Sequence, residues 1–565
     1  MGGQRPTPIF TEYTQLAFLR PRLRYPAAPA RWIYLAVWLA AGSGCQRKPP
    51  PSSEGRAPES ETQRSADPSP ALSAKPALPE APAAIVRLDG SSVVASAPAG
   101  DAAARVYAKA PQTWIYAEPR QNAGKLGYLR MGSSVEINPK AIVNSACPKG
   151  WYALIPRGFI CADTGSTVDR NDQLVQAMRD LGPTLDRKLP YIYATVRRPG
   201  PWFRRLPTGS ELTSAEPDLG KRMEKWLTAA GESGAGFAQF VWVPPGAKVQ
   251  DPNAAWQNKL TDDPLPDFLK SGRFAPRTTS DGTPAGDSAS LGTMARRVGF
   301  SFLRTVWSEG RHYGLTSKFE LVPTDRVRPI QGSDFHGFRI PEDIDFPFAI
   351  VRQPGAMLFT YDSLSKKTTA HGHAPYRSAL KLSGKQAFFR GKLFYETTEG
   401  LWISDRDASR LDAVRKMPAW GSNGEKWIDI NVTKQTLALY EGTKAVYATL
   451  VSTGEAGLSD PESSTATKRG IYRIHTKHIS ATMDSDAVGE EFELRDVPYV
   501  QYFESNYALH GAYWHDRFGI PKSHGCINLA PEDARRIFFW TEPTLPAGWH
   551  GVLLPLKGTV LFVHP

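Results

Sequence analysis

The chain has 565 residues, of which 41% are hydrophobic, and carries a formal net charge of +12. Its length exceeds what one hydrophobic core supports and predicts three or four domains, while its apolar content excludes a chain that is disordered throughout. The basic charge would suit an anionic partner, but no block of Lys and Arg with interleaved aromatic residues occurs. We therefore expect a solvated basic surface and no nucleic-acid partner.

The first 45 residues have the pattern of an export signal. Thirteen uncharged residues, from Trp32 to Gly44, follow four arginines between positions 20 and 31. A membrane-spanning helix needs about 20 residues, so this run is too short to cross a bilayer. A basic flank, an apolar core and small residues before a cleavage site are typical of a secretory signal.

The residues before Cys45, Gly42-Ser43-Gly44, resemble the lipobox of bacterial lipoproteins. That resemblance implies cleavage before Cys45 and attachment of lipid to this cysteine, so we expect a lipid-anchored protein of the cell envelope that faces the periplasm. An uncleaved anchor would give the same topology. Residues 46–100 are rich in Pro, Ala, Ser and Glu and bury too little apolar surface to fold, which predicts a disordered tether.

Residues 101–168 contain short β-type runs that Gly, Pro and Asn punctuate at close spacing, as in a small barrel. The placements of Gly150-Trp-Tyr and Gly158-Phe-Ile resemble the bacterial SH3-like module of cell-wall enzymes. Cys147 and Cys161 lie fourteen positions apart in this module. They could form a disulfide in an oxidising compartment, or stay as two separately buried thiols.

The middle of the chain contains little that points to chemistry. Residues 169–344 predict an α+β region with a helix over 172–181, a strand over 190–196 and a long loop from about 244 to 295. Residues 345–420 predict a second SH3-like module, since three positions of the first module recur there at the same offsets. Tyr152, Gly158 and Asp163 correspond to Phe394, Gly400 and Asp405.

The last predicted domain, residues 424–565, contains the residue with the clearest reactive potential, Cys526. A free thiol has a pKa of about 8.5, so a catalytic cysteine needs a neighbouring base or a positive field. His510 precedes Cys526 by sixteen positions and can approach it from an adjacent strand, so we assign it the general base. His524 and Gly525 lie within a tight turn whose backbone N–H groups could form an oxyanion hole.

These residues resemble the signature of the L,D-transpeptidase catalytic-domain family: a histidine, a gap, then Ser/Thr-His-Gly-Cys, a hydrophobic residue and Asn or Arg. The matching residues here are His510, Ser523, His524, Gly525, Cys526, Ile527 and Asn528. The resemblance implies a mainly β fold, a β-sandwich with a short helix after the cysteine. It also implies that peptidoglycan stem peptides are the substrate, that Cys526 forms a thioester with release of D-alanine, and that no cofactor is required.

Further roles depend on this resemblance. The Gly511 carbonyl is expected to hold the tautomer of His510. Ser523 and Asn528 are expected to contact substrate, and Tyr502 or Tyr499 could lend a hydroxyl to the oxyanion, although a packed aromatic ring is the other interpretation of each tyrosine.

Several alternatives stay open at this stage. His510, His515, His524 and Cys526 could bind zinc, but the single residue between His524 and Cys526 is fewer than structural zinc pairs usually have, so we expect no metal. Attack by water would make the enzyme a carboxypeptidase, and an anchored protein could be the acceptor. A wall endopeptidase with SH3-like modules, or an inactive wall-binding lipoprotein, would be the rival proteins.

Overall fold

The computed structural model describes residues 103–565 apart from positions 223, 225–269, 273–283, 285, 309–310, 363, 390, 486–491 and 554–557, together with two short strands, β1 (Ile85–Val86) and β2 (Ser92–Val93). The predicted export signal, Cys45 and nearly all of the predicted tether lie outside these residues, as does most of the predicted long loop. In the described part of the chain, no helix has both the length and the apolar character that crossing a membrane requires.

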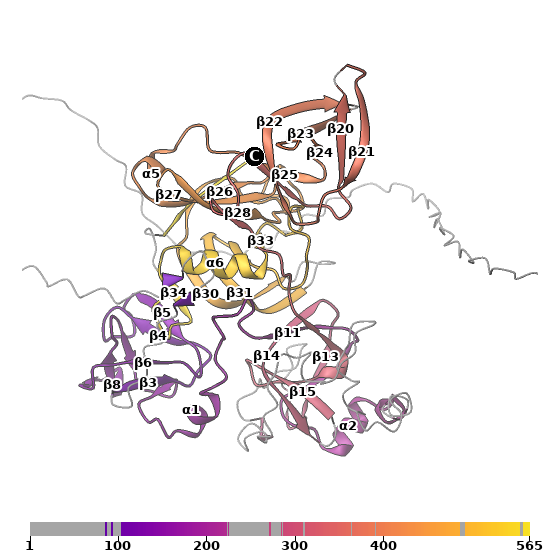
Figure 1. Ribbon diagram of the computed structural model, residues 1–565. Coiled ribbons are helices and arrows are strands. Elements are labelled where there is room, and N and C mark those ends of the chain that lie inside the picture. Colours follow the sequence, from indigo (N-terminus) through magenta and orange to yellow (C-terminus); the bar gives the residue numbers. More distant parts are fainter. Residues whose placement is uncertain are drawn as a thin grey trace, which may run out of the picture. The chain divides into compact units, whose positions relative to one another are not determined.

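The described structure is mainly β, as the sequence predicts, and contains several sheets (Figure 1). Eight short strands lie between residues 105 and 167: β3 (Arg105–Ala108), β4 (Thr113–Tyr116), β5 (Lys125–Leu129), β6 (Ser134–Glu136), β7 (Ile142–Asn144), β8 (Cys147–Ala153), β9 (Phe159–Cys161) and β10 (Ser166–Thr167). Apolar residues from successive strands, including Val106, Ile115 and Ile160, are completely buried, and they share one hydrophobic cluster with residues of the last domain such as Ile428.

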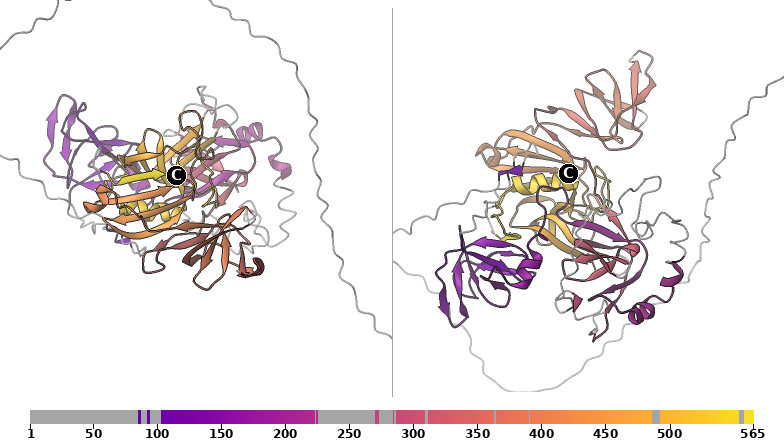
Figure 2. Two further views of the ribbon diagram at one scale, coloured as in Figure 1. Left: turned by 90° about the horizontal axis from the view of Figure 1, so that it is seen from above. Right: turned by 60° about the horizontal axis from the view of Figure 1, so that its bottom comes forward.

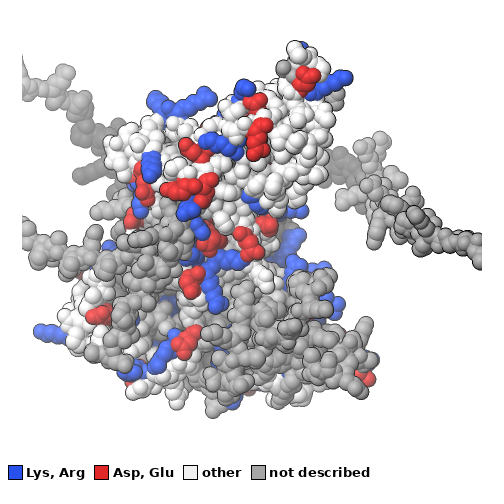
Figure 3. All heavy atoms as spheres, viewed as in Figure 1, with Lys and Arg blue, Asp and Glu red and all other residues white. Residues whose placement is uncertain are grey.

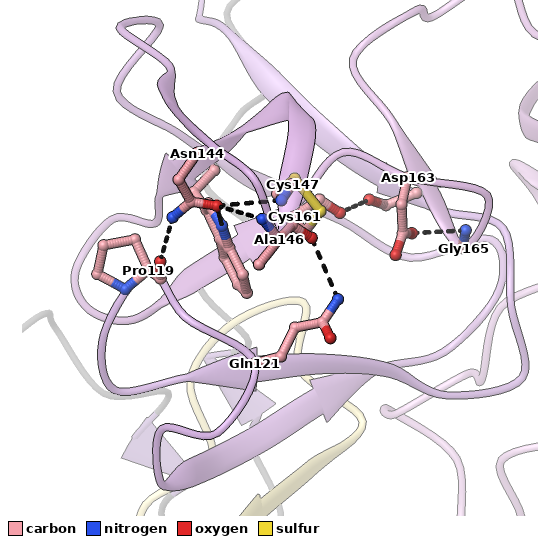
Figure 4. Close-up of a disulfide and its surroundings, with 10 residues drawn as sticks. Pro119, Gln121, Asn144, Ala146, Cys147, Cys161, Asp163 and Gly165 are labelled. Atoms are coloured by element: carbon pink, nitrogen blue, oxygen red, sulfur yellow. Dashed lines mark hydrogen bonds between the residues drawn. A yellow bond between two sulfur atoms is a disulfide. The ribbon is translucent and has the colours of Figure 1, made fainter.

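Cys147 and Cys161 form a disulfide between β8 and β9, with their Cα atoms 5.8 Å apart, which decides between the two alternatives left open by the sequence (Figure 4). Asn144 supports it, because its side-chain oxygen accepts hydrogen bonds from the backbone N–H of Ala146 and Cys147 and from the indole of Trp151. The turn that leads into β8 is therefore fixed at three points.

The described part of residues 169–344 contains strands and short helices, and the helix and strand predicted there are present. The elements are α1 (Gln173–Met178), β11 (Ile192–Val196), β12 (Gly200–Phe203), α2 (Gly209–Ala215), β13 (Ser290–Met294), β14 (Val298–Ser308), β15 (Arg311–Thr316), β16 (Leu321–Pro323), the 3-10 turn η4 (Thr324–Arg326), β17 (Val327–Ile330) and β18 (Phe338–Arg339). Asp172 caps α1 by accepting from the N–H of Leu174.

A seven-stranded sheet follows, which we call the β19–β25 module. Its strands are β19 (Phe348–Val351), β20 (Met357–Asp362), β21 (Lys367–His373), β22 (Ala379–Phe389), β23 (Lys392–Thr397), β24 (Trp402–Ser404) and β25 (Ala408–Leu411). The first and last strands pair with each other, Phe348 with Leu411, so the module begins and ends at the same place.

The last domain contains two packed sheets. Its elements are α5 (Ala419–Ser422), β26 (Lys426–Asn431), β27 (Thr436–Glu441), β28 (Lys444–Leu450), β29 (Gly470–Arg473), β30 (Thr476–Ser485), β31 (Phe492–Glu504), β32 (Tyr507–Gly511), β33 (Ile527–Leu529), α6 (Pro531–Trp540), β34 (Gly551–Leu553) and β35 (Val560–His564). One core joins apolar residues of β26 and β27 to those of β31, β32, β33 and α6, which confirms the predicted sandwich with a short helix after Cys526.

Helix α6 lies against β31 and β32 (Figures 1 and 2) and is fixed at both ends. In its first turn, the buried carboxylate of Asp533 accepts hydrogen bonds from Tyr447, Thr449 and the N–H of Gly337. At its other end, Lys477 donates to the Thr541 carbonyl at 2.8 Å and to that of Phe538. Burial lowers the pKa of Lys477 to about 7, and the helix packs against β31 and β32.

Acidic and basic side chains are interspersed over the described surface that faces the viewer in Figure 3. On that face the net positive charge does not gather into a single basic patch. This arrangement agrees with the solvated surface that the composition predicts.

Candidate active site

Strands β32 and β33 pair in parallel, and their register brings the predicted residues together. His510 lies opposite Asn528, and Leu509 lies opposite Ile527. Because successive side chains of a strand alternate between faces, His510 and Asn528 share one face, while Leu509 and Ile527 enter the domain core on the other. Cys526, just before β33, packs on the first face in a cluster with Ala508, Tyr502 and Trp514.

Cys526 is the one free cysteine of the described residues, and it is only partly buried. Its Sγ lies 3.6 Å from the backbone carbonyl oxygen of Asn506, the only hydrogen-bond acceptor that it contacts in the described chain. Burial raises the pKa of the thiol to about 11, and the Ala508 backbone opposes this shift only in part. The cysteine therefore rests as a protonated thiol at neutral pH.

His510 is buried, with an exposed fraction of 3%, and its ring lies 5.7 Å from that of Trp514. Burial lowers the pKa of this imidazole to about 4, and the backbone of Gly511 opposes the shift without reversing it. The ring is neutral at pH 7, so it can accept a proton. Its Nδ1 has no hydrogen-bond partner within the described residues, so the tautomer-holding role of Gly511 stays a prediction.

The turn before Cys526 is shaped by Gly525, whose φ of +126° suits glycine. A Cβ atom there would lie 2.8 Å from Cε1 of Tyr507, so a side chain has no room. The Gly525 N–H donates to Ser523 Oγ at 3.2 Å, and this hydroxyl in turn donates to the Cys526 carbonyl.

These bonds correct two predictions. Because the Gly525 N–H already donates a hydrogen bond to Ser523 Oγ, this N–H is not free to stabilise an oxyanion. The buried Ser523 hydroxyl holds the turn and is not exposed for contact with substrate. The backbone N–H groups of His524 and Cys526 stay as the predicted oxyanion donors. The His524 side chain is exposed and stacks on Phe492, with 5.5 Å between ring centroids.

Asn528 contacts a residue that the sequence suggested only as a zinc ligand, His515. The amide of Asn528 lies 3.0 Å from Nε2 of His515, and the N–H of Arg517 donates to Nδ1 of the same ring. The atom of Asn528 that meets Nε2 is the amide nitrogen, Nδ2. The amide oxygen of Asn528, Oδ1, is buried and, within the described chain, unpartnered. Asn528 is therefore available to a ligand on this face.

The structure separates the two candidate tyrosines. Tyr502 lies in the cluster that contains Cys526, and its pKa is raised, first by burial and then by proximity to Cys526. Tyr499 is completely buried against Phe538, and its hydroxyl donates to the Arg187 carbonyl at 2.7 Å. The expectation that Tyr499 contributes to the site is wrong, because its hydroxyl is committed to the core, whereas Tyr502 stays a candidate.

Residues 425–559 match the family profile of the YkuD domain, described as the L,D-transpeptidase catalytic domain. This segment belongs to that family. The match begins one residue before β26 and includes every residue of the predicted site. Among the described residues, no group of three or more His, Cys, Asp or Glu could hold a metal ion.

Solved structures of L,D-transpeptidases are similar to part of this chain. An Enterococcus faecium L,D-transpeptidase mutant has 20% identity over 25% of this chain and 50% of its own, with a TM-score of 0.19. A Stackebrandtia nassauensis L,D-transpeptidase has 25% identity over 27% of this chain and 58% of its own, with a TM-score of 0.18.

For L,D-transpeptidase 3 from Mycobacterium tuberculosis the identity is 18%, over 33% of this chain and 79% of that one, and the TM-score is 0.20. The chain thus spans about half of the length of the first two structures. Comparison with curated protein sequences gave no match.

Proposed function

We propose that this protein is a cysteine acyltransferase that uses Cys526 to cross-link peptidoglycan stem peptides. The observation that carries the proposal is the parallel pairing of β32 and β33, which places His510 and Asn528 on the face where Cys526 packs. The family match of residues 425–559 supports the substrate class.

The first step forms a thioester. His510 accepts the thiol proton of Cys526 as the sulfur attacks the carbonyl carbon of the L-configured centre that precedes the terminal D-alanine. Since the free thiol and imidazole both rest neutral, proton transfer accompanies the attack rather than preceding it. The backbone N–H groups of His524 and Cys526 receive the developing oxyanion. The C–N bond then breaks, and D-alanine leaves with the proton from His510.

The second step resolves the thioester. An amine of a second stem peptide attacks the thioester carbonyl, loses its proton to His510, and the new amide bond forms as the C–S bond breaks and the thiol recovers that proton. If water replaced the amine, the product would be the shortened stem, and the enzyme would be a carboxypeptidase. A lipid anchor at Cys45 would place this chemistry at the periplasmic side of the membrane, and an anchored protein could also supply the amine.

Incubation of the full chain with disaccharide-tetrapeptide, followed by mass spectrometry, tests this function. We expect loss of alanine together with a cross-linked dimer, and no activity in Cys526→Ala. Loss of alanine without a dimer would indicate a carboxypeptidase, and cleavage inside the stem would indicate an endopeptidase. Full activity in Cys526→Ala would refute the nucleophile, and loss of activity on chelation would favour the zinc alternative.

A further inference from the structure

Residues 512–523, which we call the linking loop, connect the base to the nucleophile and contain no helix and no regular strand. Regular strands satisfy their backbone groups by hydrogen bonding to neighbouring strands. The linking loop has no such strand partner, so its carbonyl groups need other donors. Four consecutive carbonyls, at positions 516 to 519, accept hydrogen bonds from side chains. These side chains decide where the loop lies.

Two arginines of the β19–β25 module supply three of the four partners. Arg377 donates to the Phe518 carbonyl at 2.6 Å and to the Asp516 carbonyl at 3.0 Å. Arg352 donates to the Gly519 carbonyl at 3.0 Å. The fourth, the carbonyl of Arg517, accepts from the Ser452 hydroxyl within the catalytic domain at 2.7 Å.

Both arginines are themselves held in place. The Arg377 side chain is only 11% exposed, and its guanidinium lies 4.6 Å over the ring of Phe335. Arg352 also donates to the carbonyls of Asp405 and Arg406, on the turn between β24 and β25. A planar guanidinium with several fixed donors suits this task better than a flexible ammonium.

The close fit extends to the backbone of the loop. Gly519 has a φ of +96°, and a Cβ atom there would lie 2.8 Å from the Cβ of Arg352. The absence of a side chain at Gly519 therefore lets Arg352 reach the loop.

The linking loop carries two residues that contact the site. Trp514 packs beside the His510 ring, and His515 meets the Asn528 amide. His515 also lies 5.1 Å from the ring of Phe518, whose carbonyl Arg377 holds. A continuous set of contacts thus runs from the module to the base and to Asn528.

We propose that the β19–β25 module positions the active site, with Arg352 and Arg377 as positioning residues that hold the linking loop by its carbonyl groups. The inference rests on the proposed function for its catalytic consequence, but not for the positioning itself. Both arginines lie outside residues 425–559, so the module supplies what the catalytic domain lacks.

The test compares Arg377→Met and Arg352→Met with Arg410→Met in the full chain. Arg410 is a matched control: it belongs to β25, is similarly buried, pairs with Asp412 and lies over Tyr395. Amide hydrogen exchange of the peptide containing residues 512–523 should be about 10-fold faster in the first two variants than in the control. This measurement needs no substrate.

Turnover of disaccharide-tetrapeptide gives the catalytic readout. We expect kcat about 10- to 100-fold lower in both variants, with KM changed by less than about 2-fold, because a displaced loop misplaces groups rather than removing binding contacts. Arg377→Lys, which keeps the positive charge but has a single nitrogen in place of the planar fork, should fall between wild type and Arg377→Met.

Exchange equal to that of Arg410→Met in both variants would overturn the positioning role. Faster exchange with unchanged kcat would overturn its catalytic consequence. If the wild-type chain did not act on the tetrapeptide, the proposed function would fail, and the exchange experiment alone would decide whether the arginines hold the loop.

Discussion

Two buried polar groups of the catalytic domain, Asp496 and His510, have opposite surroundings. The Asp496 carboxylate accepts hydrogen bonds from four side chains, those of Arg130, Ser301, Ser317 and Ser480. Nδ1 of His510 has no partner in the described chain.

The charge states differ in the same way. Burial alone would raise the pKa of Asp496, but the Arg130 guanidinium and the serine hydroxyls hold it well below its usual range. Burial lowers the pKa of His510, and no charged partner compensates. Since proteins satisfy nearly all buried polar groups, the contrast favours a structural role for Asp496 and fits the general-base role that we propose for His510.

The largest expected effect is that of His510→Gln. Loss of a general base should lower the rate of thioester formation by about 10²- to 10⁴-fold. The melting temperature should not fall, because no hydrogen bond of Nδ1 is lost. Rapid-quench mass spectrometry measures the rate and calorimetry the melting temperature. A rate close to that of wild type would remove His510 from the mechanism.

Asp496→Asn should have the opposite signature. It leaves Arg130 buried without its counter-charge, so we expect the free energy of unfolding to fall by about 3–5 kcal/mol. Chemical denaturation measures this change. Asp460→Asn is the control, because Asp460 is exposed and bonds only its own turn, including Ser463. Equal stability of the two variants would mean that the Asp496 network is not structural.

The resting thiol gives a third prediction. With a pKa near 11, Cys526 should react with iodoacetamide at pH 7.5 about 300-fold more slowly than a cysteine with the ordinary pKa of about 8.5, and the rate should rise tenfold with each pH unit. Peptide mapping after timed alkylation measures it. A rate independent of pH between 6 and 9 would show that a thiolate and an imidazolium already exist in the free enzyme.

A fourth prediction concerns acid stability. Burial lowers the pKa of His312, His478, His510 and His515 to about 4. Between about pH 6.5 and pH 4 these residues bind protons only in the unfolded chain, so the free energy of unfolding falls as pH falls, by about 1–3 kcal/mol for each histidine. Denaturation at pH 7 and pH 5 measures the change, and His510→Gln should reduce it. A free energy of unfolding that rose from pH 7 to pH 5 would contradict the claim that these imidazoles are neutral in the folded protein.

The sequence predicts the family of the last domain and the mainly β fold, because the motif that marks the family is short and local. The β-sandwich and the short helix after Cys526 follow from the family resemblance, and the roles of Cys526 and His510 stay predictions. Which tyrosine faces the site does not follow, since β31 contains positive φ angles at Asp496 and Tyr499 that interrupt simple alternation.

Long-range partners are also beyond the sequence. Arg352 and Arg377 contact the linking loop across more than a hundred residues, and nothing in their neighbourhood marks them as different from surface arginines. The use of the Gly525 N–H by Ser523 depends on a φ angle that glycine permits but does not dictate. These features appear only when the strands and loops are placed in space.

The most direct test of the central claim is the mass of the Cys526-containing peptide after the full chain is mixed briefly with disaccharide-tetrapeptide and quenched in acid. We predict an adduct on Cys526 equal to the substrate less D-alanine, absent from Cys526→Ala and slow to form in His510→Gln. Release of D-alanine without that adduct, at the same rate in Cys526→Ala, would contradict a sulfur nucleophile beside a neutral imidazole.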